Sequence, residues 1–248
     1  MCAIGDVRWL LDGAFAVLML LPPDTLHVWL ARFDELADAQ AAYASWLSGD
    51  EIERSARLID AEARQRFIIA RGLLRSVLAR YLSMPPAALS FAYGPRGKPA
   101  VPGSTLSFNL SHAGDWLLLG VTEQGALGVD IEEMQSMETM ATVSRSNFST
   151  AEREALDRLP ADLQERGFYL CWTRKEAFIK ATGHGFGRRL RDFDVSLHPA
   201  EPPRLLRIEG DDPARWSLVH IDPAPGYVGA ACVETPHPPE VELFHFAG

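Results

Sequence analysis

The stretch from Trp172 to Gly183, WTRKEAFIKATG, constrains the fold of this chain more than any other. At 3.6 residues per turn it predicts a helix with one face that combines apolar and charged side chains. That face consists of Trp172, Lys175, Glu176, Ile179 and Lys180. Gly183 is a typical helix stop. The face suits neither a pure core nor plain solvent. Either the helix is amphipathic with an ordinary Glu176–Lys180 ion pair, or this face belongs to a functional site.

A second stretch, Gly128-Val129-Asp130-Ile131-Glu132, follows a turn and predicts a β-strand. Alternation along a strand puts Asp130 and Glu132 on the same face. Two neighbouring carboxylates repel each other unless a positive charge lies between them. Hard oxygen ligands suit Mg²⁺, which leaves its other positions to water and phosphate oxygens. The alternative is an exposed strand end with its acids in solvent, which Glu133 supports.

Together with two further pieces, these stretches resemble the signature of the 4′-phosphopantetheinyl transferases of the Sfp type. That signature is a Gly-Val-Asp-Ile-Glu strand followed by a Trp-x-x-Lys-Glu-Ala-x-x-Lys helix, here residues 128–132 and 172–180. Gly97-Lys98-Pro99 and Asn109-Leu110-Ser111-His112 precede them in the expected order. Each piece is weak alone, but the ordered set is specific, and the resemblance in layout extends over essentially the whole chain.

The resemblance implies a transferase of the holo-[acyl-carrier-protein] synthase type. Such an enzyme moves the phosphopantetheine arm of coenzyme A onto a serine of an apo carrier protein, which is an acyl, peptidyl or polyketide carrier. The other product is adenosine 3′,5′-bisphosphate. The reaction is expected to need Mg²⁺, with Mn²⁺ also possible because both ions take oxygen ligands.

By the same resemblance, Asp130, Glu132 and Glu176 would bind the metal ion. Glu176 would also accept the serine proton, directly or through a bound water. Lys180, one helical turn further, would reach a phosphate oxygen. The other implied coenzyme A contacts are Lys175, Ser111 and His112 at the phosphates, Lys98 and Pro99 near the adenine, and Arg66 at the 3′-phosphate.

Two of these roles have alternatives. Lys175 could pair with an acid in the wall of the site instead of a phosphate. Glu152 takes a place in the family pattern that makes it a second candidate for the proton acceptor. However, Ser149 lies three residues earlier, and this spacing predicts a capping box in which Glu152 binds the start of a helix.

The chain departs from the family pattern just before its first long helix. Family members often carry lysine or arginine there to hold the 3′-phosphate. This chain has Asp50, Glu51 and Glu53 instead, with Arg54 and Arg57 as candidate substitutes. The resemblance therefore leaves open which basic residues bind the 3′-phosphate.

A faint internal repeat bears on the fold. Capping boxes are predicted at Ser48 and Ser149, 101 positions apart (149 − 48). At this offset the helix expected over 61–82 falls on the central helix, and the strand 27–31 falls on 128–132. We therefore expect an α+β protein of two similar halves, residues 1–124 and 125–248, which agrees with the pseudo-dimeric fold known for the family.

The repeat is asymmetric, which predicts one active site at the interface of the halves. At the same offset Asp130 corresponds to Trp29, and Glu176 corresponds to Arg75. The first half thus lacks the acids. We expect it to contribute to coenzyme A binding, while the second half carries the metal-binding and catalytic motifs.

The ends of the chain carry weaker signals. Residues 14–21 form an apolar run that predicts a strand, because it is too short to span a bilayer and makes a poor signal peptide. Prolines at 223, 225, 236, 238 and 239 predict loops and a loose C-terminal tail.

Composition narrows the class of protein. A net charge of −9 argues against a nucleic-acid binder, which would be basic. Three widely spaced cysteines give neither a disulfide framework nor a zinc spacing, which indicates a reducing compartment. We expect a cytoplasmic monomer without a nucleic-acid or membrane partner.

Two other functions use the same residues. A Mg²⁺-dependent nucleotide pyrophosphohydrolase would employ the same acids and lysines with water as the nucleophile. A non-catalytic module that binds coenzyme A or a carrier protein would tolerate Asp130→Ala and Glu176→Ala in binding.

Overall fold

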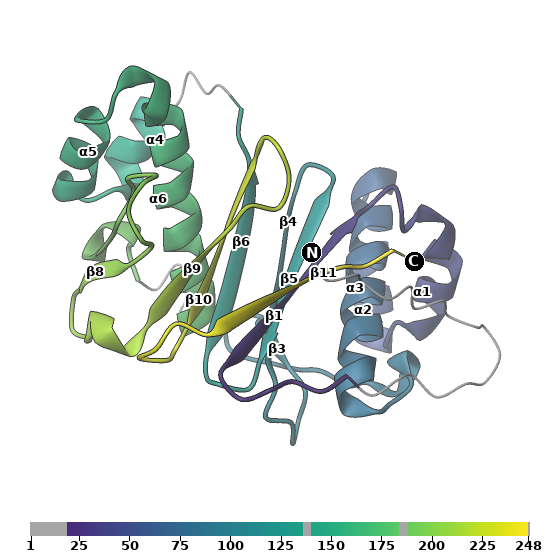
Figure 1. Cartoon of the computed structure of the whole chain (residues 1–248). Coiled ribbons are helices and arrows are strands. Elements are labelled where there is room, and N and C mark those ends of the chain that lie inside the picture. The colour runs from purple at the N-terminus through teal and green to yellow at the C-terminus, as the bar shows by residue number, and fades with distance from the viewer. Residues whose placement is uncertain (1–18, 136–139, 184–187, 248) are drawn as a thin grey trace.

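The computed structural model describes residues 19–135, 140–183 and 188–247. Two groups of helices lie on the outer sides, and the strands lie between them (Figure 1). The first half contains β1 (Thr25–Arg32), α1 (Gln40–Trp46), α2 (Gly49–Ala56), α3 (Ala61–Leu82), β2 (Ala92–Tyr93), β3 (Pro99–Ala100), β4 (Ser107–Ala113) and β5 (Trp116–Thr122). The second half contains β6 (Leu127–Glu133), α4 (Met140–Asn147), α5 (Thr150–Asp157), α6 (Ala161–Thr182), β7 (Phe193–Val195), β8 (Leu205–Ile208), β9 (Ser217–Ile221), β10 (Tyr227–Val233) and β11 (Glu240–His245).

Both halves follow the same succession of elements. A strand leads to a short helix, then to a helix of 22 residues, and finally to an antiparallel hairpin. In each half the first strand pairs with the last strand of the hairpin, which gives the orders β1-β5-β4 and β6-β10-β9. The predicted α+β fold of two similar halves is confirmed.

The two predicted capping boxes are also confirmed. The backbone N–H of Ser48 donates to the Glu51 carboxylate at 3.0 Å at the start of α2. The N–H of Ser149 donates to Glu152 at 2.9 Å at the start of α5. Each box satisfies a backbone N–H at the helix start that has no partner within the helix.

The long helices follow a slightly different offset from the capping boxes. They begin at Ala61 and Ala161, 100 positions apart (161 − 61). Arg75 therefore corresponds to Lys175, and the predicted correspondence of Arg75 with Glu176 is wrong. The contacts agree, because Arg75 pairs with Glu51 at 2.6 Å and Lys175 pairs with Glu152 at 2.7 Å. The linker between the short helix and the long helix is one residue longer in the first half than in the second. A single offset therefore cannot align both helices.

An apolar layer joins the halves. Leu26, Val28 and Leu118 of the first sheet pack against Val129 and Ile131 of the second, and all five are fully buried or nearly so. In each half, one further apolar cluster lies between the sheet and the long helix of that half. Because β6 turns its odd-numbered residues toward the other half, its even-numbered residues face α6.

Gly128 sets the distance between β6 and α6. A Cβ atom at this position would lie 2.1 Å from the carbonyl oxygen of Ala177 and 2.2 Å from the backbone nitrogen of Ala181. The backbone of the strand therefore rests directly on the backbone of the helix. This contact explains the glycine at the start of the acidic strand motif.

The prediction of a loose C-terminal tail is wrong. Residues 240–245 form β11, which pairs in parallel with β1. The Phe244 ring stacks on Trp29 with centroids 4.6 Å apart, and Phe246 is buried in the first core. The prolines before Glu240 only separate this strand from β10. The prolines predicted a loose tail, but the packing of Phe244 and Phe246 against the first half orders this segment.

The predicted strand at 14–21 is not found where the structure describes it. Residues 14–18 lie outside the described residues, and residues 19–21 have no strand structure. Among the helices of the described residues, none has the length and apolar character needed to cross a bilayer.

We expect Gly128→Ala to lower the free energy of unfolding by about 1–3 kcal/mol, because the added methyl group must displace the helix backbone. Gly49→Ala is the matched control, since a Cβ at Gly49 meets nothing within 4 Å and alanine favours a helix. Urea unfolding of both variants tests this. Equal stability of Gly128→Ala and the parent protein would contradict the close contact.

Candidate functional site

One cleft lies between the halves and consists of two adjoining hollows. The first measures about 690 Å³ and is lined by α2, α3, the loop at 94–99 and the end of α6. The second measures about 740 Å³ and is lined by β6, α6 and the segment at 188–191. Five residues border both hollows and thus mark their junction: His112, Glu176, Lys180, Arg188 and Leu190.

Asp130 lies at the junction of β6, α6 and β4. Its carboxylate Oδ1 accepts hydrogen bonds from Lys180 Nζ at 2.6 Å and from Ser111 Oγ at 3.1 Å. Its Oδ2 atom is buried and has no hydrogen-bond partner among the described residues. Burial raises the pKa of Asp130, and the Lys180 ammonium opposes that rise.

Glu132 and Glu176 line the second hollow beside Asp130. Glu132 accepts a hydrogen bond from Trp172 Nε1 at 3.0 Å. Burial, together with the charge of Asp130, raises the pKa of Glu132 to about 7. The same two causes raise the pKa of Glu176. The three carboxylates thus share one hollow, and the charge of Asp130 destabilises the ionised forms of Glu132 and Glu176.

These acids fit a divalent cation that prefers oxygen ligands. Among the described residues, no donor reaches the buried acceptor Asp130 Oδ2, and the Lys180 ammonium opposes the rise in pKa of each of the three acids. In the described residues, no three His, Cys, Asp or Glu side chains are already grouped to hold a metal ion. Binding would therefore require Glu132 or Glu176 to change its side-chain conformation.

Strand β4 brings the Asn-Leu-Ser-His motif to the same place. Ser111 Oγ accepts from Lys180 Nζ at 2.8 Å while it donates to Asp130, so it links the two halves. Asn109 Oδ1 accepts from the backbone N–H of Val129 at 2.8 Å and thereby holds β4 beside β6. Sequence reasoning did not assign Asn109 a role, although the motif contained it.

His112 borders both hollows and packs edge-on against Phe33 with ring centroids 5.7 Å apart. Burial lowers its pKa, and the charges of Lys180 and Arg66 lower it further. At neutral pH the imidazole is therefore neutral, with one nitrogen as a donor and the other as an acceptor.

The structure places Lys98, Pro99 and Arg66 in the wall of the first hollow. The Lys98 ammonium points into the protein and donates to the carbonyls of Leu127, Lys180 and Ala181. Burial lowers the pKa of Lys98 to about 8.

Arg66 is already engaged by groups of the first half. Its guanidinium binds the Glu62 carboxylate at 2.9 Å, the Gly114 carbonyl at 2.5 Å and the Asp115 carboxylate at 3.2 Å. Any contact with a phosphate would have to compete with these partners.

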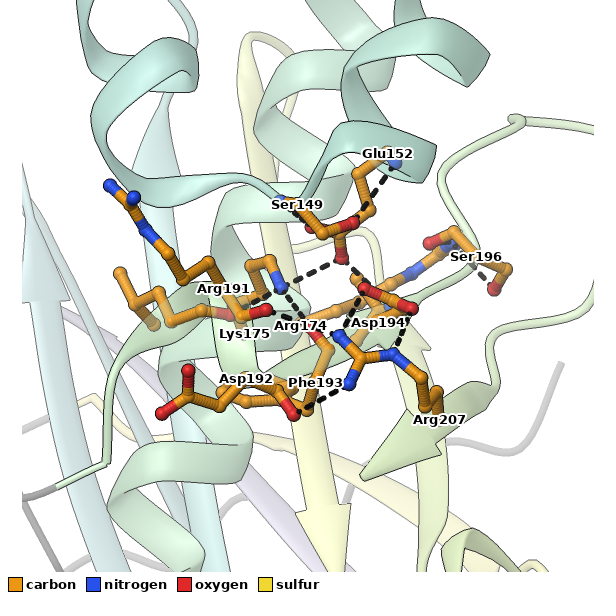
Figure 2. A network of polar contacts seen from close by, with 12 residues as sticks. Ser149, Glu152, Arg174, Lys175, Arg191, Asp192, Phe193, Asp194, Ser196 and Arg207 are labelled. Atoms are coloured by element: carbon orange, nitrogen blue, oxygen red, sulfur yellow. Dashed lines mark hydrogen bonds and ion pairs between the residues drawn. The ribbon is translucent and has the colours of Figure 1, made fainter. Parts of the chain in front are cut away.

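Lys175 does not lie in the cleft, which corrects the prediction that it contacts a phosphate. Its side chain is fully buried, and Nζ donates to the carbonyls of Leu190 at 2.8 Å and Phe193 at 2.6 Å. Figure 2 shows this nitrogen facing Glu152, which lies 2.7 Å away. The alternative prediction, that Lys175 pairs with an acid in the wall of the site, is confirmed for the pairing, but the acid is Glu152, which lines neither hollow.

Glu152 likewise lies outside the cleft. Besides the capping box and Lys175, its carboxylate accepts from the backbone N–H of Val195 at 2.9 Å, and Glu152 is 2% exposed. It lines neither hollow. As a candidate proton acceptor it is therefore excluded by burial and by its occupied oxygens.

Sequence reasoning missed a group of arginines after α6. Arg188, Arg189 and Arg191 line the second hollow, and Arg188 also lines the first. Arg188 Nη1 is buried without a hydrogen-bond partner in the described part of the chain. The cluster of three arginines within four residues was a visible signal of an anion-binding wall.

Comparison with known protein families agrees with both halves. Residues 126–232 match the model of the 4′-phosphopantetheinyl transferase superfamily. Residues 31–124 match the model of the N-terminal part of 4′-phosphopantetheinyl transferases.

Several individual transferases are similar over most of their length. The 4′-phosphopantetheinyl transferase HetI of Nostoc sp. is 34% identical over 87% of this chain and 90% of its own. The transferase psf-1 of Bacillus pumilus is 32% identical over 74% of this chain and 76% of its own. Sfp of Bacillus subtilis is 29% identical over 80% and 87%, respectively. With these matches across both halves, the chain belongs to the 4′-phosphopantetheinyl transferases of the Sfp type.

Proposed function

We propose that this protein transfers the 4′-phosphopantetheine group of coenzyme A to a serine of an apo carrier protein and releases adenosine 3′,5′-bisphosphate. The observation that carries the proposal is the meeting of Asp130, Glu132, Glu176 and Lys180 in one cleft between the halves. In a chain of this family, that set supplies both a metal site and a proton acceptor. Coenzyme A is the substrate, and the carrier is an acyl, peptidyl or polyketide carrier protein.

The first hollow suits the nucleotide part of coenzyme A. Its walls combine apolar surfaces, such as Phe67 and Pro99, with the cations Arg54 and Arg96. Apolar surface can hold the adenine, and guanidinium groups bind phosphate in two-point contacts. The pyrophosphate would then reach the junction of the hollows, where Lys180 and His112 lie.

The residues that would hold Mg²⁺ are Asp130, Glu132 and Glu176. When bound, the ion supplies positive charge to the crowded pyrophosphate oxygens. Mn²⁺ suits the same oxygen ligands. Lys180 is the residue of this chain that stabilises negative charge at the reacting phosphate, because its ammonium is held at the junction by Asp130 and Ser111.

The transfer step needs a proton acceptor near the serine. The serine oxygen attacks the phosphorus next to pantetheine, a new P–O bond forms, and the bond to the nucleotide phosphate breaks. Glu176 takes the serine proton, since it borders both hollows and burial raises its pKa toward the working range of a general base. The nucleotide leaves with the electron pair as a phosphate monoester.

We also propose that the protein works as a cytoplasmic monomer of the holo-[acyl-carrier-protein] synthase type. The three widely spaced cysteines support the reducing compartment, and the family resemblance supports the synthase type. Cys171 and Cys232 are free and buried, which suits a reducing compartment.

The first test is the intact mass of an apo carrier protein after incubation with this protein, coenzyme A and Mg²⁺. We expect a gain of one phosphopantetheine, lowered by about a hundredfold or more in rate by Glu176→Ala because the proton acceptor is lost. Glu154→Ala, an exposed acid on α5, is the control and should act like the parent.

Two results would contradict this proposal. Release of nucleotide from coenzyme A without any change in several carriers would indicate hydrolysis. No change in either reactant, with coenzyme A still bound, would indicate a binding module.

A second prediction separates Arg54 and Arg57, the two candidate substitutes for binding the 3′-phosphate. Arg54 lines the first hollow, lies over Phe67 at 5.5 Å and has no carboxylate partner among the described residues. Arg57 lies outside the hollow and pairs with Glu53. Arg54→Ala should raise KM for coenzyme A by about tenfold, whereas KM for 3′-dephospho-coenzyme A should not change. Steady-state kinetics with both substrates tests this, with Arg57→Ala as the control. An equal effect on both substrates would assign Arg54 to another part of the nucleotide.

A third prediction concerns stability without metal. The folded protein keeps Glu132 protonated up to about pH 7, whereas its ordinary pKa is 4.5, so ionisation costs stability across this interval. In EDTA at pH 8, Glu132→Gln should raise the free energy of unfolding by about 1–2 kcal/mol. The gain should vanish near pH 5, where the parent carboxyl is protonated. Urea unfolding at both pH values tests this, and a gain independent of pH would contradict the raised pKa of Glu132.

A further inference from the structure

Lys98 reaches from the first half into the second. It lies in the loop that lines the first hollow, directly before β3. Its Nζ donates to the carbonyl oxygens of Leu127 at 2.8 Å, Lys180 at 2.8 Å and Ala181 at 3.1 Å. All three acceptors belong to the second half.

The three carbonyls come from the two elements that carry the acids. Lys180 and Ala181 lie in the last turn of α6, where carbonyls have no partner within the helix. Leu127 is the first residue of β6. A single ammonium therefore joins the end of the helix to the start of the strand, and its positive charge suits the C-terminal end of a helix.

The contacts leave Lys98 no donor for a ligand. An ammonium group has three N–H donors, and three backbone acceptors take them. The Lys98 ammonium is therefore not free to bind a phosphate, although the loop around it lines the first hollow. A contact with coenzyme A would fall to the backbone of this loop and to Pro99.

We propose that Lys98 is a positioning residue for the transfer reaction, which rests on the function proposed above. By tying the end of α6 to the start of β6, it holds Lys180 against Asp130 and keeps Glu176, one turn earlier on α6, at the same hollow. Because the same residue belongs to the wall of the first hollow, it also couples the nucleotide-binding loop to the reacting groups. Small displacements of reacting groups lower the rate strongly, while they leave substrate binding nearly intact.

The test is Lys98→Met, which keeps the aliphatic stem and removes the ammonium. We expect kcat for carrier modification to fall by about tenfold to a hundredfold, with KM for coenzyme A within about twofold. Arg158→Met is the control, since Arg158 is an exposed cation that pairs with Glu154 and lines neither hollow. It should leave kcat unchanged.

Hydrogen–deuterium exchange gives a readout that does not need activity. In Lys98→Met, peptides covering residues 176–183 should exchange faster, while peptides of α3 should keep the parent rate. Lys98→Arg, which keeps a cation with several donors, should restore part of both kcat and the slow exchange. Binding of adenosine 3′,5′-bisphosphate to each variant reports whether it is folded.

The outcomes separate the two proposals. A rise in KM for coenzyme A with unchanged kcat would make Lys98 a substrate ligand and overturn the positioning role. Unchanged kinetics with unchanged exchange would also overturn it. If the parent protein modifies no carrier, the proposed function fails, and the exchange data alone then decide whether Lys98 fixes the end of α6. If Lys98→Met does not fold, Lys98→Arg decides, since parent-like KM with a reduced kcat supports positioning.

Discussion

The direct contact between the backbones of β6 and α6 at Gly128 is the constraint on which the site depends. Any side chain at this position would collide with the helix, so only glycine lets the strand come this close. The closeness brings Asp130, two residues further along the strand, to 2.6 Å from Lys180 on the helix. The acids on β6 and the acid on α6 consequently border one hollow instead of two separate surfaces. The close approach of the strand to the helix therefore determines which charged groups meet at the site.

Buried ion pairs stabilise the frame around this contact in both halves. Glu51 with Arg75 and Glu152 with Lys175 each connect the start of a short helix to the long helix, and each cation also binds a carbonyl that follows the long helix. Removing one partner of such a pair would leave an uncompensated charge in the interior. The halves therefore share a structural device, whereas in the described part of the chain the acids that border the cleft, Asp130, Glu132 and Glu176, all belong to the second half. A duplicated frame thus carries these acids on one of its two copies.

The sequence predicted the local features well, because they depend on neighbours in the chain. Capping boxes at Ser48 and Ser149 were correct, since a capping box needs only a hydroxyl and a carboxyl three residues apart. The helix at 61–82 and the alternation of β6 were also correct. The C-terminal strand was missed because its stability comes from pairing with β1, which is far away in the sequence. Lys175 was assigned to the phosphates by the family resemblance, which does not show what packs against this residue.

The residues of the strand motif and the helix motif, read in order, determined the family, the α+β class and the set of acids. They did so through their resemblance to the family signature, and the spacing within a strand or a helix fixes which of these side chains share a face. Only the tertiary structure decided which charged groups remain available. Burial paired Lys175 with Glu152 and tied Lys98 to three carbonyls, and it left Lys180 and the three acids at the cleft. A charge cannot be buried without a partner, and the partner is chosen by the packing of distant segments.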